Sequence, residues 1–333
     1  MAQASFAHQA LFWHCAALPS RLAVAMASSK WTQRVLLAAL CAEVRGQGLG
    51  PVDQCPGSVN VMGAGTAALV ATKINMPNVP AGPVKNVDGV VMPEMWGRAY
   101  LADQCTDGTY DHNQYVGIPL LGKKFIYTTD VSQAGCGCNA ALYLVSMKQN
   151  SEVSGCEDYY CDANSVCGVR CDEIDIQEAN KFAWHSALHR YDDGNGLAQG
   201  FGGWARDMTS AEYGPGARCI DTNSPFKVEV SFPVGNAGRL ASMDVRLSQH
   251  GKPCDVSFRM DSYSHDAGFE HLSQSLAAGM TPVISYWKAS DMLWLDGPGA
   301  GGGPCQQDDM ACGTAPSFSA FAIEDLEAST LYP

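Results

Sequence analysis

Short hydrophobic or alternating runs, separated by Gly, Pro, Asp and Asn, recur along the chain from about residue 120 onward. Each run has the length of a β-strand, and helical periodicity is weak. Such runs with frequent turn signals predict an antiparallel β-sandwich or barrel. The predicted strands span residues 124–128, 141–147, 226–232, 243–247, 256–260, 282–287 and 318–323.

Three further segments refine this pattern. Residues 227–232 alternate between polar and apolar side chains, as expected for a strand with one solvated face. Residues 271–278 can form two helical turns before Gly279, and the glycine-rich residues 297–303 are predicted to form a loop near Cys305. We therefore expect one mostly β domain over residues 50–333.

Composition narrows the classes of function. The chain has 333 residues, of which 46% are hydrophobic, so a large core can form. The formal net charge of −13 disfavours nucleic acid as a partner, and no basic stripe offsets it. A neutral substrate suits such an acidic chain.

Fourteen cysteines indicate disulfides, because their spacings do not match a zinc site. The N-terminal region agrees with this interpretation. A segment starting at Met26 has two basic residues and then a short apolar stretch over 35–42, the pattern of a signal peptide. That stretch is too short to cross a bilayer, which takes roughly 20 residues, so no membrane partner is expected.

We predict that residues 1–43 are a leader, with translation starting at Met26, and that the protein is secreted. Removing the leader discards Cys15 and Cys41 and leaves twelve cysteines, an even number that can form six disulfides. A monomer is expected.

The segment with the clearest chemistry contains Glu173, Asp175 and Glu178. On a regular strand the first two share a face and Glu178 points away. A β-bulge after Asp175 would return Glu178 to their face, and bulges are common beside active sites. Closely spaced carboxylates raise one another's pKa, and retaining glycosidases use two of them about 5–5.5 Å apart. A solvated acidic strand or a calcium site would explain the three residues alone equally well.

The flanking sequence resembles glycoside hydrolase family 7, the cellobiohydrolases and endoglucanases of fungal type. The similarity extends over several blocks in the same order. The blocks are LLGKKF at 120–125, CGCNAALY at 136–143, YCD at 160–162, CDEIDIQEAN at 171–180, YGPG at 213–216, and 279–296 ending in MLWLD.

This resemblance implies a concanavalin-like β-jelly-roll sandwich of two antiparallel sheets, with a substrate cleft on the concave sheet. It implies that Glu173 is the nucleophile, Asp175 its supporting carboxylate and Glu178 the acid/base. The implied substrate is a β-glucan polysaccharide, and neither a cofactor nor a metal is expected.

The resemblance also implies substrate-binding roles for residues that, taken singly, have simpler explanations. A lone histidine is more often structural, a lone arginine a surface charge, and a tryptophan part of the core. The implied substrate-binding residues are Asn139, Tyr143, Tyr160, Asp162, His189, Arg206, Trp287 and Trp294. The family's bridge near the motif implies a disulfide from Cys136 to a C-terminal cysteine, Cys305.

The chain departs from the family pattern in several places. Before residue 95 it does not align, and no tryptophan lies between Trp31 and Trp96 to form the far end of a tunnel. The segments at 143–160 and 206–280 are shorter than in the family, where they carry roofing loops. We therefore expect an open cleft and internal cleavage. Gln177 inside the motif and Arg190 after His189 also depart from the family, which leaves the cleft's shape open.

Two other classes remain as alternatives. One is a jelly-roll enzyme of family 16, which shares the ExDxxE pattern and cleaves β-1,3/1,4-glucans or algal galactans. The other is a non-catalytic carbohydrate-binding jelly roll, which the complete set of carboxylates disfavours.

Overall fold

The computed structural model describes residues 52–202, 207–235, 237–263, 268–299, 301–307 and 312–327. The predicted leader at residues 1–43, with its signal peptide, lies outside the described residues. Within the described ranges, no helix combines the length and the apolar character needed to span a bilayer.

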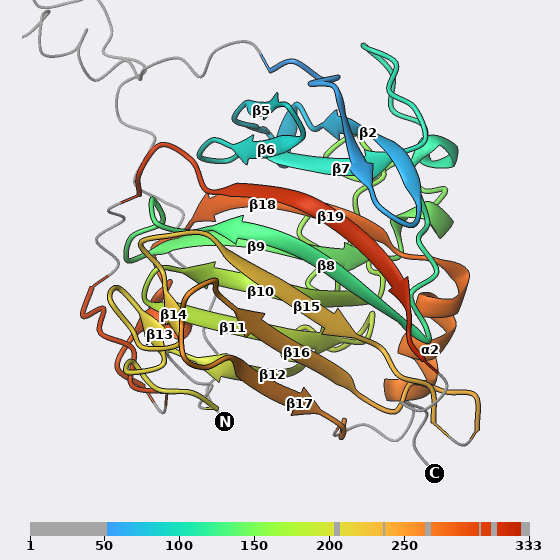
Figure 1. The fold of residues 1–333 in the computed structure, drawn as a ribbon. Helices are drawn as coiled ribbons and strands as arrows, with labels where there is room; N and C mark the ends of the chain where they lie inside the picture. The colour runs from blue at the N-terminus through green and yellow to red at the C-terminus, as the bar shows by residue number, and fades with distance from the viewer. Residues whose placement is uncertain are drawn as a thin grey trace, which may run out of the picture. The chain divides into compact units, whose positions relative to one another are not determined.

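Two antiparallel sheets packed face to face form the protein (Figure 1). The eight-stranded sheet has the order β1-β2-β7-β18-β9-β10-β11-β12 and the seven-stranded sheet the order β17-β16-β15-β8-β19-β6-β5. The first consists of β1 (Ser58–Val61), β2 (Gly65–Ala71), β7 (Arg98–Ala102), β18 (Thr281–Lys288), β9 (Cys138–Val145), β10 (Glu173–Asn180), β11 (Ala183–His189) and β12 (Leu197–Phe201). The second consists of β17 (Val256–Met260), β16 (Met243–Ser248), β15 (Phe226–Ser231), β8 (Lys123–Asp130), β19 (Ser317–Asp325), β6 (Val90–Pro93) and β5 (Val84–Val87).

Smaller elements connect and flank these sheets. They are β3 (Ile74–Met76) paired with β4 (Val79–Pro80), β13 (Tyr213–Gly214) paired with β14 (Ile220–Asp221), the 3₁₀ turns η1 (His112–Gln114) and η2 (Met147–Gln149), and the helices α2 (Gly268–Ala278) and α3 (Leu293–Asp296). Gly279, at φ +100°, ends α2 where the sequence predicts.

The fold confirms the predicted jelly-roll sandwich. Every strand predicted from the hydrophobic runs is present, with ends that differ by at most a few residues. The strands before residue 95, together with β7, β11 and β12, were not predicted. Two of them, β7 and β11, are buried along their whole length, so they lack the alternation that marks a strand with one wet face.

The core lies between the two sheets. On β8 the apolar side chains of Phe125 and Tyr127 point inward and alternate with more exposed neighbours. On β9 every position is buried, because one face meets the core and the other lies beneath the loops of the cleft. Because both faces of the central strands are buried, these strands are packed rigidly, and the residues of the candidate site lie on them.

Six disulfides join all twelve cysteines of the described residues, as the count predicted. They are Cys55–Cys105, Cys136–Cys305, Cys138–Cys312, Cys156–Cys167, Cys161–Cys171 and Cys219–Cys254. The bond from Cys136 to Cys305 confirms the pairing that the resemblance implied. Two of the bonds close the loop at residues 156–171, which forms one wall of the cleft.

Candidate active site

A β-bulge in β10 sets the positions of the three acidic residues. Asp175 pairs with Tyr143 of β9, but it is Gln177 that pairs with the next residue of β9, Leu142. One extra residue is thereby accommodated in β10, and the pairing with β11 shifts at the same point. The bulge brings Glu178 into the same cleft as the other two carboxylates, which confirms the predicted bulge.

The same bulge directs Gln177 into the core between the sheets. Its side chain is fully buried, and its Nε2 donates hydrogen bonds to Thr129 Oγ1 at 3.2 Å and to Ala140 O at 3.1 Å. Its Oε1 accepts a hydrogen bond from the Tyr127 hydroxyl at 3.0 Å. This departure from the family pattern therefore changes the contact between the sheets and not the lining of the cleft.

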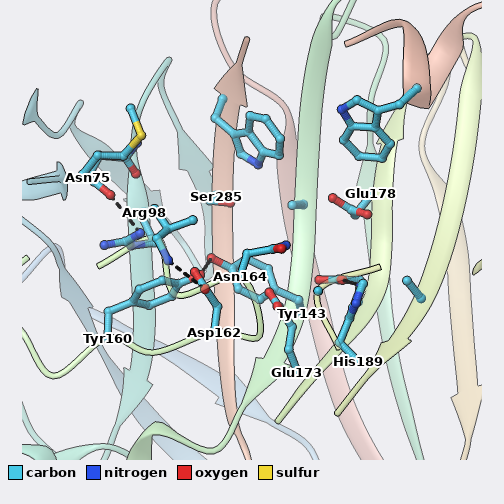
Figure 2. A pocket seen from close by; sticks show the side chains of 18 of the residues that line it. Asn75, Arg98, Tyr143, Tyr160, Asp162, Asn164, Glu173, Glu178, His189 and Ser285 are labelled. Carbon is cyan, nitrogen blue, oxygen red and sulfur yellow. Dashed lines mark hydrogen bonds and ion pairs between the residues drawn. The ribbon is translucent and has the colours of Figure 1, made fainter. Parts of the chain in front are cut away.

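A cleft of about 430 Å³ lies over β10 and its neighbours (Figure 2). It gathers most of the residues that the sequence singled out. Those that line it are Tyr143, Tyr160, Asp162, Glu173, Asp175, Glu178, His189, Trp287 and Trp294. Asn139 is fully buried and holds Glu178 through a hydrogen bond from its Nδ2 to Glu178 Oε1 at 3.0 Å. Arg206 lies outside the described residues.

His189 lies beside the carboxylates and carries a positive charge. Its Nε2 lies 3.0 Å from Asp175 Oδ2, and its Nδ1 lies 3.1 Å from the carbonyl oxygen of Asp193. Both ring nitrogens therefore face acceptors, an arrangement that suits the doubly protonated imidazolium. Burial alone would lower the pKa of His189, but the hydrogen bond and charge of Asp175, with the two glutamates, raise it to about 10.

The two glutamates retain protons more strongly than in water. Burial and the charge of Asp175 raise the pKa of Glu178 to about 8, so its carboxyl is protonated at neutral pH. Burial and the charges of Asp175 and Asp162 raise the pKa of Glu173 well above its usual value. Against this, Glu173 Oε2 accepts a hydrogen bond from the backbone N–H of Ala163 at 3.1 Å, which favours its ionised form. Carboxyl groups of unequal environment facing one cleft can share acid and nucleophile roles.

Two tyrosine hydroxyl groups, one on β9 and one on the loop at residues 156–171, extend this polar surface. The Tyr143 and Tyr160 hydroxyls lie 3.0 Å apart. Asp162 Oδ1 accepts a hydrogen bond from the backbone N–H of Val166 at 3.0 Å, which orients the carboxylate. Together they offer hydrogen-bonding groups beside Glu173, as a site for sugar hydroxyls requires.

Two tryptophans form an aromatic wall near Glu178. Trp287 lies on β18 and Trp294 on α3, with ring centroids 6.4 Å apart and a stacked geometry. Both rings are half-buried and line the cleft, although they also pack against a small apolar cluster. Asp296 holds α3 in place, since its Oδ2 accepts hydrogen bonds from Asn180 Nδ2 at 2.7 Å and from Gly137 N at 2.8 Å.

Sequence reasoning missed a buried polar cluster behind the cleft wall. Arg98 is 3% exposed, and its guanidinium lies 3.8 Å from the centre of the Tyr160 ring. Arg98 Nη2 lies 3.7 Å from Asp158 Oδ2, and Thr72 Oγ1 donates to the same oxygen at 2.6 Å. Asp158 belongs to no motif, so nothing in the sequence indicated it. Trp96 and Asn164 also line the cleft and were not predicted as site residues.

Comparisons with known proteins agree with this geometry. The sequence profile described as "Glycosyl hydrolase family 7" matches residues 94–165. The chain is 27% identical to "Endo-beta-1,4-glucanase celB" of Emericella nidulans, over 68% of this chain and 67% of that protein. It is 26% identical to "Endoglucanase 1" of Pyricularia oryzae, over 66% of this chain and 64% of the relative. The chain thus spans about two thirds of the length of these relatives.

Solved structures share the fold. A structure of the native Humicola insolens endocellulase EGI superposes with a TM-score of 0.60 at 19% identity, covering 84% of this chain and 99% of that one. A structure titled "Endoglucanase I complexed with cellobiose" gives a TM-score of 0.62 at 17% identity, with coverage of 84% and 99%. At such identities the likeness shows the fold.

A two-sheet jelly roll with a carboxylate-lined cleft across one sheet is the architecture of a class of glycoside hydrolases. Within this class, the chain is similar to glycosyl hydrolase family 7, whose sequence profile matches residues 94–165.

Proposed function

We propose that the protein is a secreted, retaining endo-β-1,4-glucanase that cleaves cellulose-like chains. The observation that carries the proposal is the bulge in β10, since it gathers Glu173, Asp175 and Glu178 on one cleft. The names of the relatives support a β-1,4-glucan as substrate. Six disulfides support action in an oxidising, extracellular environment.

In the first step Glu173 attacks the anomeric carbon with a carboxylate oxygen. Glu178, protonated at neutral pH, gives its proton to the glycosidic oxygen as the bond to the leaving sugar breaks. The products are a glycosyl ester on Glu173 and a released chain with a new hydroxyl. Asn139, which donates to Glu178 Oε1, leaves the other oxygen of Glu178 to face the substrate.

In the second step Glu178, now ionised, takes a proton from water. The resulting hydroxyl oxygen attacks the anomeric carbon, and the ester bond to Glu173 breaks. Two inversions restore the original anomeric configuration. Burial and the charge of Asp175 raise the pKa of Glu173, which makes the Glu173 carboxylate a stronger nucleophile in the first step, and His189 holds Asp175 in position.

The central experiment replaces Glu173 with Gln, which keeps the shape and removes the nucleophile. We expect release of reducing sugar from soluble cellulose derivatives and from barley β-glucan to fall at least about a thousandfold. Proton NMR of the wild-type reaction should show the β-anomer as the first product. An α-anomer at early times would contradict the proposal, because it would mean inversion.

The Glu178→Gln variant distinguishes the role of the acid/base from that of the nucleophile. This variant should lose most of its activity on β-glucan but recover part of it on aryl β-cellobiosides, whose good leaving groups need less proton transfer. Glu173→Gln should show no such recovery. Equal losses on both substrates in both variants would contradict the assigned roles.

We propose cleavage within chains because the sequence predicts an open cleft. Viscosity of carboxymethyl cellulose should fall early, before much reducing sugar appears. Activity confined to β-1,3-linked glucans would instead favour an enzyme of the family 16 type. Binding without release from any glucan would favour a carbohydrate-binding protein.

A further inference from the structure

Trp96 lines the cleft but belongs to none of the catalytic or substrate-binding groups described above. Its ring is half-buried, and Asn75, Met76 and Arg98 line the same cleft. Figure 2 shows Asn75 and Arg98 on one side of the pocket and Glu178 and His189 on the opposite side. Trp96 precedes Arg98 of β7 by two residues, and its N–H bonds to Tyr286 O of β18. It therefore belongs to the side of the cleft that lies away from β11 and His189.

The backbone at Trp96 adopts a left-handed conformation with φ +68°. For a bulky aromatic residue this conformation is unfavourable, and it persists only where the surroundings enforce it. Trp96 N donates a hydrogen bond to Tyr286 O at 2.7 Å, and Gly97 N donates one to Glu94 O at 2.7 Å. These bonds fix the turn that precedes β7.

Two glycines make room for this turn. A Cβ on Gly82 would lie 2.0 Å from Met95 O, and one on Gly97 would lie 2.7 Å from Pro83 O. Both glycines therefore allow a close approach of two backbone segments that no other residue permits. A strained aromatic residue, enforced by its surroundings and directed into a cleft, is typical of a functional position.

The order of the strands shows how far Trp96 lies from the carboxylates. Trp96 bonds to β18 and precedes β7, whereas the carboxylates lie on β10, three strands from β7 in the order β7-β18-β9-β10. At about 4.8 Å per strand, this is roughly 14 Å across the sheet. A substrate chain lying across the strands would extend over more than one sugar ring between these points.

We propose that Trp96 is a stacking platform for a sugar of the β-glucan that lies distant from the cleaved bond. The proposal rests on the proposed function, which makes a β-glucan the substrate of this cleft. The indole face binds the apolar face of a pyranose, and the amide of Asn75 offers hydrogen bonds to its hydroxyls. The platform makes the enzyme select long chains over short ones.

The test compares a long and a short substrate, cellohexaose and 4-nitrophenyl β-cellobioside. Trp96→Gly removes the ring and also relieves the left-handed strain, so it is the variant expected to fold well. We expect kcat/KM for cellohexaose to fall about tenfold, equivalent to about 1.4 kcal/mol. The value for the aryl cellobioside, which is too short to reach Trp96, should change less than twofold.

Three further variants sharpen the outcome. Trp96→Phe should retain most of the activity on cellohexaose, because it keeps an aromatic face. Trp96→Ala should behave like Trp96→Gly in kinetics but have a lower Tm, because its Cβ retains the strain. Tyr191→Ala removes an aromatic side chain that is 43% exposed and does not line the cleft, and it should leave both constants unchanged.

Equal losses on both substrates in Trp96→Gly would overturn the proposal, because they would mean a structural effect on the catalytic centre. An unchanged constant for cellohexaose would overturn it too. A wild-type protein that hydrolyses neither substrate would contradict the proposed function itself, and the platform with it, whereas the first two outcomes leave that function intact.

Discussion

At the scale of single residues, one extra residue in β10 determines which side chains face the cleft. Without the bulge, Glu178 would point into the core and Gln177 into the cleft, because side chains alternate along a strand. The odd spacing between Asp175 and Glu178 made the bulge predictable, since three carboxylates had to share one face for the chemistry. The orientation of Gln177 follows from the same bulge, although the sequence alone did not indicate whether Gln177 shapes the cleft.

Gln177→Leu should lower stability without lowering the activity of folded protein. The substitution keeps the volume but removes the acceptor of the Tyr127 hydroxyl and the donor to Thr129. Buried polar groups left without partners cost about 1–3 kcal/mol each. Urea unfolding should therefore show a clear loss of stability, while kcat/KM at 25 °C stays within about twofold of the wild type.

Gln306→Leu is the control, since Gln306 is exposed, and its free energy of unfolding should change little. A Gln177→Leu enzyme with wild-type stability would contradict the role of Gln177 between the sheets. A large fall in kcat/KM without any loss of stability would mean that the side chain acts in the cleft.

At the scale of elements, the loop at residues 156–171 and strand β7 meet behind the cleft. Asp158 accepts hydrogen bonds from the loop itself and from β7, and it faces the buried Arg98, whose guanidinium supports the ring of Tyr160. The two disulfides of the loop restrain the same segment. The loop is thus held by covalent bonds along its length and by one buried ion pair at its base.

Asp158→Asn should destabilise the protein far more than the loss of a surface pair. The variant leaves the Arg98 charge buried without its counter-ion, and breaking such a pair costs about 3–5 kcal/mol. Glu270→Gln is the matched control, because its pair with Arg239 spans 3.3 Å but both side chains are about half exposed, and such pairs contribute about 0–1 kcal/mol. Thermal unfolding of both variants gives the comparison. Similar small losses would show that Asp158 does not anchor the loop.

The same elements show what the sequence could and could not predict. Strands with one wet face, such as β8 and β15, were readable from alternation alone. β11 and β7 are buried at every position and carry no such signal. The carboxylates of the site stood out because like charges so close together need a function. Asp158, Arg98 and Trp96 depend on contacts between segments far apart in sequence, which no local pattern encodes.

At the scale of the whole molecule, a chain with net charge −13 holds a buried site that binds protons more tightly than the unfolded chain does. The folded pKa of Glu178 is about 8 against an ordinary value of 4.5, and that of His189 is about 10 against 6.5. Between those values the native state carries more protons than the unfolded state. Stability is therefore greatest below the ordinary values and is lost as the pH rises through the folded ones.

We accordingly expect the Tm of the wild type to fall as the pH rises from about 5 to 9, and Glu178→Gln to show a shallower fall, because its amide cannot titrate. Repulsion among the negative charges of the protein also grows with pH. A control variant must therefore distinguish this repulsion from the loss of the buried proton. Glu270→Gln removes an exposed negative charge, so it reduces this repulsion but leaves the buried proton site intact, and its pH slope should match that of the wild type. A slope as shallow in Glu270→Gln as in Glu178→Gln would assign the effect to total charge and would contradict the raised pKa of Glu178.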